Sequence, residues 1–543
     1  MTAKPDNPSP RKAALAGFRR HAGTVGGLTM LSRLFGFARD VLMAAALGAG
    51  PVADAFFIAF KLPNFFRRIT AEGAFNASFV PLYAGLLGTT ADEAARERAA
   101  DFAGKVLGWF LPVLLILLAI MEAAMVPVMT GLTGGFDGDT EKFDLAVELG
   151  RATFPYLVTI SLVAFFSGLL NAHTHFAAAA FVPVLFNLVL ITALLSAGET
   201  ALDTARALAW AVSLSGLVQL VWVYGAARRA GIRIRFQLPR PSADVARLAR
   251  LMGPAALGAG ALQLGLLVDL FLAARFLDDG AVSWLFYADR LHQLPIGVVG
   301  VAVGIVLLPG ISRLLADGDR AGANRQQNDA ILFAMTLTLP AAAALAAIPE
   351  ALISGLFERG AFTRADSVAT GRALMAYALG LPAFVLVKVL TPGYHARRDT
   401  RTPVRYAMMA LVVNLALNLI LIGPMAHAGL ALATSLSAWV NVALLARGLT
   451  GQGLLEVAGD TWRRLGRALV ATALMTAGLI GLASVMPALV AALPGGLTGG
   501  IAGDAVPLVL LVGAGLTLYF GAAFALGVYA PASLLARLSR RPR

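Results

Sequence analysis

Residues 54–62 read Asp-Ala-Phe-Phe-Ile-Ala-Phe-Lys-Leu, and residues 283–291 read Ser-Trp-Leu-Phe-Tyr-Ala-Asp-Arg-Leu. Both stretches are rich in aromatic and apolar residues and carry charged side chains inside the apolar run. Each leads into a further apolar segment that ends near a proline, at Pro81 and at Pro309, and these prolines are 228 positions apart. The sequence therefore predicts that one helical unit occurs twice in the chain.

Two further matches occur in the same order along the chain. Ser213 recurs as Ser435 at an offset of 222 residues, and His175 recurs as His395 at an offset of 220. Because the offsets are nearly equal, we expect two halves of six helices each. Six is even, so both halves have the same orientation. This is a parallel-repeat arrangement of alternating-access transporters, which place a site at the interface between the repeats.

The composition indicates a membrane protein. Of the 543 residues, 58% are apolar and 14% are charged, against roughly 45–50% and about 25% in soluble domains. These proportions exclude an ordinary soluble enzyme and a disordered chain. The absence of cysteine excludes disulfide bonds and thiolate metal sites. The net charge of +13 lies mainly in short loops, so it indicates membrane orientation rather than nucleic-acid binding.

Fourteen apolar runs are long enough to cross a membrane, at roughly 20 residues per helix. They lie at 24–47, 53–85 (with a polar break), 103–129, 152–170, 180–197, 206–226, 250–275, 282–310, 329–349, 370–393, 404–423, 427–446, 468–488 and 505–532. Lys and Arg number about 30 in the loops on one side and about 6 on the other, and the crowded side is expected to be cytoplasmic. Both termini then lie in the cytoplasm. No cleavable signal peptide is expected.

These spans predict the organisation of the chain. We expect a basic cytoplasmic tail, a lobe of spans 1–6, a basic cytoplasmic linker, a lobe of spans 7–12, a second cytoplasmic linker, spans 13 and 14, and a basic cytoplasmic tail. The predicted bounds are 1–22, 23–228, 229–249, 250–447, 448–467, 468–535 and 536–543. The predicted fold is an all-α polytopic membrane protein of two six-helix lobes plus two C-terminal helices.

Charged residues inside the predicted spans are numerous. Each costs about 2.5–3.5 kcal/mol at the middle of a membrane, so one that persists usually faces a cavity or a partner. We interpret ten of them as candidate substrate-binding residues: Arg33, Arg39, Asp54, Lys61, Arg67, Arg68, Glu72, Asp289, Arg290 and Lys388. Cations outnumber acids in the first two spans, and an arginine fork suits phosphate. The expected anion is a lipid phosphate or diphosphate. Helix capping, snorkelling and internal ion pairs are the alternatives.

Pro63 follows Lys61 within the second span. A proline inside a helix removes a backbone donor and clashes with the preceding turn. We therefore expect the helix to break at Pro63 and the backbone to loosen near Arg67 and Arg68.

A second polar group in the predicted spans carries little positive charge. It consists of Asp269 in span seven, Asn414 and Asn418 one helical turn apart in span eleven, and Thr434 in span twelve. Their oxygen atoms suit a small hard cation. The alternative is interhelical hydrogen bonding, which Asn and Thr commonly make in membranes. Enzyme motifs are missing, since no Walker lysine motif, catalytic triad or metal-hydrolase spacing occurs, so no enzymatic activity is expected.

Several stretches together resemble one known family. They are Ser-Arg-Leu-Phe-Gly-Phe-Ala-Arg-Asp at 32–40, Asp-Ala-Phe-Phe at 54–57, Phe-Lys-Leu-Pro-Asn-Phe-Phe-Arg-Arg at 60–68, Ala-Glu-Gly-Ala-Phe at 71–75 and Tyr-Ala-Asp-Arg-Leu at 287–291. Over nearly its whole length the chain is similar to the MurJ/MviN lipid II flippases of the multidrug/oligosaccharidyl-lipid/polysaccharide (MOP) exporter superfamily, which also contains the MATE exporters. The resemblance implies two lobes around a cationic cavity, with the two C-terminal helices forming a groove for the polyprenyl tail.

The resemblance also implies site residues. The family's cavity arginines match Arg33, Arg39, Arg67 and Arg290, and a further important position matches Asp54. Some members have a sodium site whose positions match Asp269, Asn414, Asn418 and Thr434. Asn418 stands where at least one member has an aspartate, which removes one negative charge.

The implied activity is movement of lipid II, an undecaprenyl-diphosphate-linked disaccharide-pentapeptide, from the cytoplasmic to the periplasmic leaflet of the bacterial inner membrane. The movement of lipid II would occur by alternating access and would be driven by Na⁺, H⁺ or the membrane potential. The expected partners are lipid II, membrane lipids and the cell-wall synthesis machinery, with no bound cofactor and no nucleic acid. The alternatives are a flippase for another polyprenyl-linked glycan and a cation-coupled exporter of the MATE type.

Overall fold

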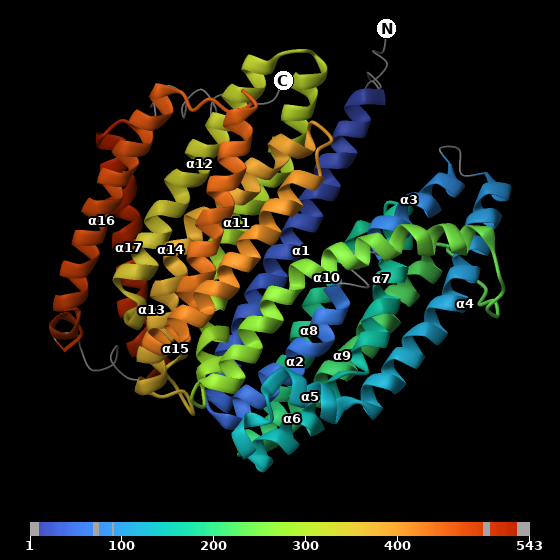
Figure 1. Cartoon of the computed structure of the whole chain (residues 1–543), viewed down its shortest axis with the longest axis horizontal. Coiled ribbons are helices and arrows are strands. Elements are labelled where there is room, and N and C mark those ends of the chain that lie inside the picture. Colours follow the sequence, from blue (N-terminus) through green and yellow to red (C-terminus); the bar gives the residue numbers. More distant parts are fainter. Residues whose placement is uncertain (1–9, 69–74, 89–91, 492–499, 529–543) are drawn as a thin grey trace, which may run out of the picture. The chain divides into compact units, whose positions relative to one another are not determined.

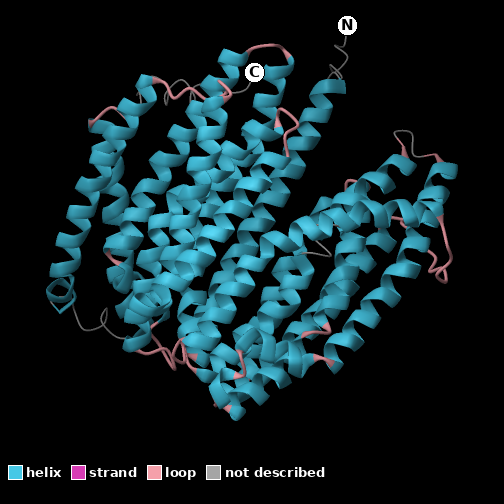
Figure 2. Ribbon diagram, viewed as in Figure 1, coloured by secondary structure: helices cyan, strands magenta, loops and turns pink. Residues whose placement is uncertain are grey.

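The computed structural model describes residues 10–68, 75–88, 92–491 and 500–528. Every regular element in these ranges is helical, which confirms the predicted all-α class (Figures 1 and 2). The α-helices are α1 (Pro10–Leu47), α2 (Pro51–Arg67), α3 (Asn76–Leu87), α4 (Glu93–Ala123), α5 (Met125–Thr133), α6 (Thr140–Thr153), α7 (Tyr156–Ala172), α8 (Phe176–Ser196), α9 (Ala201–Arg229), α10 (Ala243–Phe276), α11 (Ala281–Ala316), α12 (Arg320–Ala347), α13 (Pro349–Phe357), α14 (Arg364–His395), α15 (Arg401–Gly451), α16 (Gly459–Ala491) and α17 (Gly500–Ala525). A short 3-10 helix, η2 (Phe136–Gly138), precedes α6.

The chain divides into two compact units, Met1–Arg275 and Phe276–Arg543, called unit 1 and unit 2 below. In unit 1, α8 packs against α1 and α9, α7 packs against α9, and α2 packs against α6. In unit 2, α14 is central, because α11, α12, α13 and α15 all pack on it. Helices α16 and α17 pack on each other and on α12 and α13 respectively. The division falls at the end of α10, whereas the repeat places the start of the second lobe before that helix.

Nine helices among the described residues are long and apolar enough to cross a membrane. Several predicted spans contain parts of two helices, including the second (α2 and α3), the third (α4 and α5) and the fourth (α6 and α7). Helix α15 contains the eleventh and twelfth predicted spans, because its backbone leaves helical geometry at Ala426, where φ is 49°. Such a conformation costs a residue with a side chain of order 1–3 kcal/mol. The helices are consistent with the predicted number of spans.

Two helices extend beyond their predicted limits. Helix α1 begins at Pro10, ahead of the predicted first span, and proline is favoured in the first turn of a helix. Helix α2 continues through Pro63 to Arg67, so the predicted break at Pro63 was wrong. Pro63 leaves the carbonyl of Ala59 without its usual donor. The hydroxyl of Thr153 on α6 donates to that carbonyl at 3.1 Å and compensates for the loss.

The internal repeat is visible in equivalent contacts within each unit. Helix α3 packs on α4 as α11 packs on α12, and α5 packs on α6 as α13 packs on α14. Ser213 on α9 donates to the carbonyl of Ala152 at 2.6 Å, and its predicted counterpart Ser435 on α15 donates to the carbonyl of Ala376 at 2.7 Å. The two serines therefore make the same kind of interhelical hydrogen bond in both units.

In each unit, a non-helical segment is held against an earlier helix by hydrogen bonds. These two segments follow α9 and α15 and are called the first and second strap. The first strap, residues 232–240, follows α9 and lies across α4, where its carbonyls crowd Gly104 and Gly108. Its Gln237 side chain donates to Asp101 Oδ1 at 2.9 Å. Trp109 Nε1 donates to the carbonyl of Arg240 at 2.9 Å.

The second strap, residues 453–458, follows α15 and lies on α12. Asn324 exchanges two hydrogen bonds of 3.0 Å with the backbone of Glu456. Asn328 donates to the same carbonyl at 2.8 Å and accepts from the Ala458 N–H at 3.0 Å. Because α4 and α12 are equivalent helices of the repeat, the two straps are bound at equivalent places in the two units.

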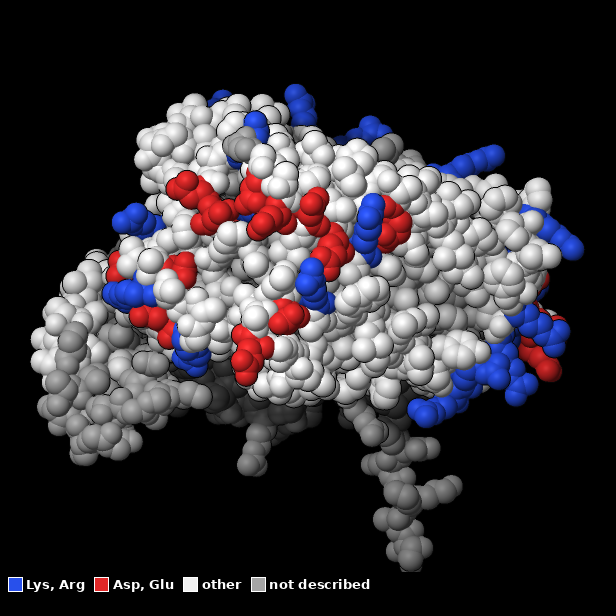
Figure 3. All heavy atoms as spheres, turned by 90° about the horizontal axis from the view of Figure 1, so that it is seen from below, with Lys and Arg blue, Asp and Glu red and all other residues white. Residues whose placement is uncertain are grey.

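Charge is distributed unevenly along the helices. Figure 3 shows a face on which Asp and Glu side chains gather, with several Lys and Arg side chains between them. In unit 1, exposed acids such as Glu141, Asp144 and Glu199 occupy the start of α6 and the loop before α9. The basic linker follows the other end of α9. This difference between helix ends is the kind that the positive-inside rule describes.

Candidate functional site

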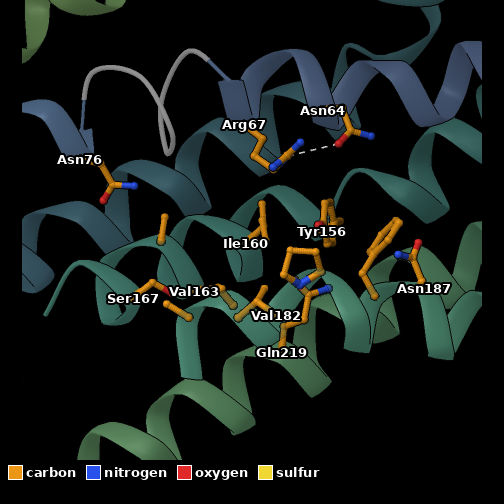
Figure 4. A pocket seen from close by; sticks show the side chains of 14 residues that line it. Asn64, Arg67, Asn76, Tyr156, Ile160, Val163, Ser167, Val182, Asn187 and Gln219 are labelled. Atoms are coloured by element: carbon orange, nitrogen blue, oxygen red, sulfur yellow. Dashed lines mark hydrogen bonds between the residues drawn. The ribbon is translucent and has the colours of Figure 1, made fainter. Parts of the chain in front are cut away.

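A cavity of about 330 Å³ lies inside unit 1 (Figure 4). Its wall is formed by α2, α3, α7, α8 and α9. The lining residues are Asn64, Arg67, Asn76, Tyr156, Ile160, Val163, Ala164, Ser167, Ala179, Val182, Pro183, Phe186, Asn187 and Gln219. The polar groups of the wall are amides, hydroxyls and one guanidinium, and the rest of the wall is largely apolar. This combination is typical of small-molecule sites.

Arg67 is the predicted substrate-binding residue that lines this cavity. It lies at the last position of α2, and its Nε donates to Asn64 Oδ1 at 3.2 Å. Asn64 in turn donates to the carbonyl of Phe60 at 2.8 Å. The continuation of α2 beyond Pro63 therefore positions both side chains at the cavity wall.

Arg39 is held by neighbouring groups at the edge of the same region. Its guanidinium pairs with Asp40 at 2.6 Å and donates to Asn187 Oδ1 at 2.9 Å. It also lies over the ring of Phe186, 5.6 Å from the ring centre. Arg39 is 6% exposed, and the pair with Asp40 compensates its charge inside unit 1. Its contact with the cavity runs through Asn187, which lines it.

Asp54 forms a buried ion pair that the sequence did not predict. Its carboxylate lies 3.5 Å from Lys142 Nζ on α6, and both side chains are almost fully buried. Lys142 also lies over the ring of Phe136. The pair links α2 to α6 and leaves Asp54 buried inside unit 1.

The other residues of unit 1 that were predicted to bind substrate lie at separate positions. Arg68 is exposed, and its Nη1 donates to Gln263 on α10 at 3.3 Å. Lys61 is half-buried on α2, and Arg33 is half-buried on α1. Glu72 lies outside the described residues.

In unit 2, the predicted residues of α11 interact along that helix. The guanidinium of Arg290 lies over the ring of Phe286, 4.5 Å from its centre. Asp289 accepts a hydrogen bond from Gln293 and lies 3.9 Å from His292 Nδ1. On α14, the side chain of Lys388 lies against Gly300 of α11, where an added Cβ would be 2.7 Å from Lys388 Cδ.

Three residues of the predicted cation site are brought together in unit 2. Asn418 Nδ2 donates to Asn414 Oδ1 at 3.3 Å, and Asn414 Nδ2 donates to Thr434 Oγ1 at 3.4 Å. Asp269 lies on α10, in unit 1. No group of three or more His, Cys, Asp or Glu side chains suited to a metal ion occurs within the described ranges. The sodium site stays a prediction.

Three residues of interest were missed in the sequence. Asn187 and Gln219 are lone polar residues inside apolar spans, and that isolation was a signal for both. Lys142 lies among acidic loop residues, and nothing in its neighbourhood indicates that it pairs with Asp54.

The comparisons with known proteins cover most of the chain. Residues 43–494 match the family described as lipid II flippase MurJ. A protein of Rhizobium tropici named probable lipid II flippase MurJ is 46% identical over 456 residues, which are 83% of this chain and 84% of that protein. A protein of the same name from Rhizobium meliloti is 43% identical over 509 residues, 93% of each chain.

Two solved structures share the fold. Lipid II flippase MurJ in an inward closed conformation superposes with a TM-score of 0.75 at 24% identity, covering 94% of this chain and 99% of that one. An inward-facing MATE family transporter of the MOP superfamily superposes with a TM-score of 0.65 at 15% identity, covering 80% and 98%. These superpositions show that the chain has the fold of these transporters. The family match over residues 43–494 and the identity over 93% of the chain show that this protein belongs to the lipid II flippase MurJ family.

Proposed function

We propose that this protein is a lipid II flippase of the bacterial inner membrane. The observation that carries the proposal is its likeness, over nearly the whole chain, to proteins named lipid II flippase MurJ. Helices long enough to cross a membrane and a cavity with an arginine in its wall support it. The protein acts as a transporter and not as an enzyme, with both termini in the cytoplasm.

The physical task is to move a polar head group across about 30 Å of hydrocarbon while the polyprenyl tail stays in lipid. Alternating access meets this task because the head group needs a polar path that opens to one leaflet at a time. Arginines of the two lobes, Arg33, Arg67 and Arg290, hold the diphosphate. Binding to both lobes couples the cargo to the movement between their two arrangements.

The membrane potential favours outward movement of the head group. Two negative charges that leave a negative interior gain roughly 4.6 kcal/mol per 100 mV if they cross without neutralisation. A cation bound near Asp269 would help to reset the empty carrier. We expect Asp269→Asn to weaken stimulation by sodium in proteoliposomes, and a wild-type protein that ignores sodium would contradict this part of the proposal.

The experiment that tests the function is replacement of the host's own flippase by this chain, with lipid II measured at the outer face of the cells. Restored exposure supports the proposal. A protein that reaches the membrane but restores none would overturn it, and would favour another lipid-linked glycan or a soluble drug as cargo.

A variant series tests the arginines in the same cells. Arg290→Ala should abolish lipid II exposure, and Arg290→Lys should restore little, because an ammonium group lacks the planar fork. Arg206→Ala is the matched control, since Arg206 pairs with Glu148 at the surface. Normal transport by a well-expressed Arg290→Ala protein would exclude the proposed role.

A further inference from the structure

The first strap carries a dense positive charge at the end of unit 1 that we assign to the cytoplasm. Five arginines and no acidic residue occur at positions 228–240, and all five side chains are exposed. Asp101 of α4, which accepts a hydrogen bond from Gln237 of the strap, pairs with Lys105 at 2.6 Å. This carboxylate is compensated by a cation of its own helix, so the strap presents a net positive charge to its surroundings.

Two large apolar side chains are exposed between these arginines. Phe236 is 51% exposed and Leu238 is 69% exposed, whereas Ile232 is buried. In water, this exposure would leave apolar surface hydrated without any gain. At a membrane surface, the same side chains enter the boundary of the acyl chains while the neighbouring cations meet anionic head groups. The exposed side of the strap therefore suits a lipid surface.

The strap crosses α4 at the edge of the apolar part of that helix. Residues 106–121 of α4 carry no charged side chain, and Val113 and Ile116 are more than half exposed, as expected for the lipid-facing side of a spanning helix. The carbonyls of the strap pack against Gly104 and Gly108, where this uncharged run begins. At a rise of about 1.5 Å per residue, the strap lies within a few ångströms of the boundary between head groups and hydrocarbon.

Hydrogen bonds to α4 keep the strap at this level. Trp109 Nε1 donates to the carbonyl of Arg240, and the Trp109 side chain is 40% exposed. Tryptophan is enriched at the membrane–water interface, where its ring lies among the head groups. Gln237 is bound to Asp101 as well. The arginines of the strap thus project from a fixed backbone, and a preformed site loses less entropy when a ligand binds.

We propose that the first strap is a lipid-binding site that holds the head groups of anionic phospholipids in the cytoplasmic leaflet. Arg233, Arg235 and Arg240 bind the phosphate groups, because the guanidinium fork matches phosphate oxygens. Phe236 and Leu238 enter the boundary between head groups and acyl chains. The lipid thus holds the strap from its exposed side, while α4 holds it through the backbone.

An anionic phospholipid fits the strap better than the diphosphate of the cargo does. The three arginines are not among the residues that line the cavity at Arg67. They are exposed beside the lipid-facing side of α4, where phospholipids are present in bulk. A phospholipid brings one phosphate diester per molecule, which suits guanidinium groups that are exposed one by one along the strap.

The test places one fluorophore on the strap of the full-length protein in lipid nanodiscs. The chain contains no cysteine, so Pro239→Cys, at an exposed position, gives a single labelling site. The discs contain phosphatidylcholine and a small fraction of quencher lipid, which carries a doxyl group close to its head group. The quencher lipid is either phosphatidylglycerol or phosphatidylcholine. Quenching by phosphatidylglycerol should be stronger by about fivefold, the effect of one basic residue near an anionic surface, and high salt should reduce this ratio.

Two double variants of equal charge locate the site. Arg233→Gln with Arg235→Gln should bring the ratio close to one. Arg96→Gln with Arg98→Gln is the matched control, because it removes the same charge from the exposed first turns of α4, outside the strap. This control should leave the ratio unchanged. Equal loss in both double variants would attribute the preference to the total charge and would overturn the proposal.

A third double variant tests the apolar contribution. Phe236→Ser with Leu238→Ser should weaken quenching by both lipids and keep the ratio between them, because the strap then withdraws from the acyl boundary while its arginines remain. Unchanged quenching by both lipids would contradict the insertion of these side chains.

Two further outcomes would overturn the proposal. One is equal quenching of the wild-type strap by the two quencher lipids. The other is a fluorescence response to added undecaprenyl diphosphate without any preference for phosphatidylglycerol, which would assign the strap to the cargo. Because no transport is measured, these results are independent of whether the protein moves lipid II.

Discussion

At the scale of single residues, the buried pair of Asp54 and Lys142 shows what an intramembrane charge can do besides bind cargo. The pair joins α2 to α6, with both side chains almost inaccessible to solvent. Pairing keeps two charges where neither would persist alone. The pair therefore fixes the position of α2, whose last residue is Arg67.

Removal of the lysine should reveal the strength of this pair. We expect Lys142→Met to destabilise the protein by about 3–5 kcal/mol, because it leaves the Asp54 carboxylate buried without that cation. The measurement is the melting temperature in detergent. Arg206→Met is the control, since it breaks an exposed pair with Glu148 that also involves α6 and should leave the melting temperature nearly unchanged. Equal effects of the two variants would contradict the prediction.

His173 should make the stability depend on pH. Burial, helped by His175 and Arg96, lowers the pKa of His173 below its usual 6.5. The folded chain then binds fewer protons than the unfolded chain below pH 6.5, so stability is complete above that pH and declines as the pH falls. Tyr83 Oη lies 3.0 Å from His173 Nε2, a contact that suits the neutral ring.

The check is thermal unfolding between about pH 5 and pH 8, a window centred on the ordinary range of histidine. His173→Gln should flatten the decline below pH 6.5. A slope that is identical in wild type and His173→Gln would show that another group is responsible.

At the scale of elements, the first strap depends on two glycines of α4. A Cβ at Gly108 would lie only 1.9 Å from the carbonyl oxygen of Gln237, and one at Gly104 only 2.3 Å from that of Arg235. Small residues four positions apart allow close backbone approach in this way. The groove that Gly104 and Gly108 leave on the surface of α4 is occupied by the first strap, a non-helical segment, rather than by another helix.

Gly108→Ala should therefore release the strap from α4. We expect faster trypsin cleavage at the arginines of residues 232–240 and a lower melting temperature. Gly225→Ala on α9 is the matched control, because a Cβ there would meet no atom within 4 Å. An alanine in an open helix position is usually stabilising by up to about 1 kcal/mol, so the two variants should differ in sign. Unchanged cleavage in Gly108→Ala would contradict the account of the groove.

At the scale of the whole molecule, the uneven charge predicts the orientation of the chain. The chain contains no cysteine, so a single introduced thiol is unique. Glu199→Cys, before α9, should react with an impermeant reagent added outside spheroplasts. Asp317→Cys, after α11, should react only after lysis. Both positions are exposed. The reverse pattern would contradict the assignment of both termini to the cytoplasm.

Much of the architecture could be predicted from the sequence, since apolar runs and repeats are local patterns. The spacing of Asn414 and Asn418 correctly placed both on one face, where they meet. The pairing of Asp54 with Lys142 could not be foreseen, because no periodicity reports contacts between distant helices. The prediction of a helix break at Pro63 was wrong for a similar reason, because the hydroxyl of Thr153 that compensates for the lost hydrogen bond lies ninety residues further along the chain.

The first strap also bears on the order in which the protein is made. Its partners on α4 and the strap itself all precede residue 241. N-terminal units generally fold first during synthesis, and every residue that makes this contact is translated before α10. The newly inserted first half can thus secure its own end while the rest of the chain is still being translated.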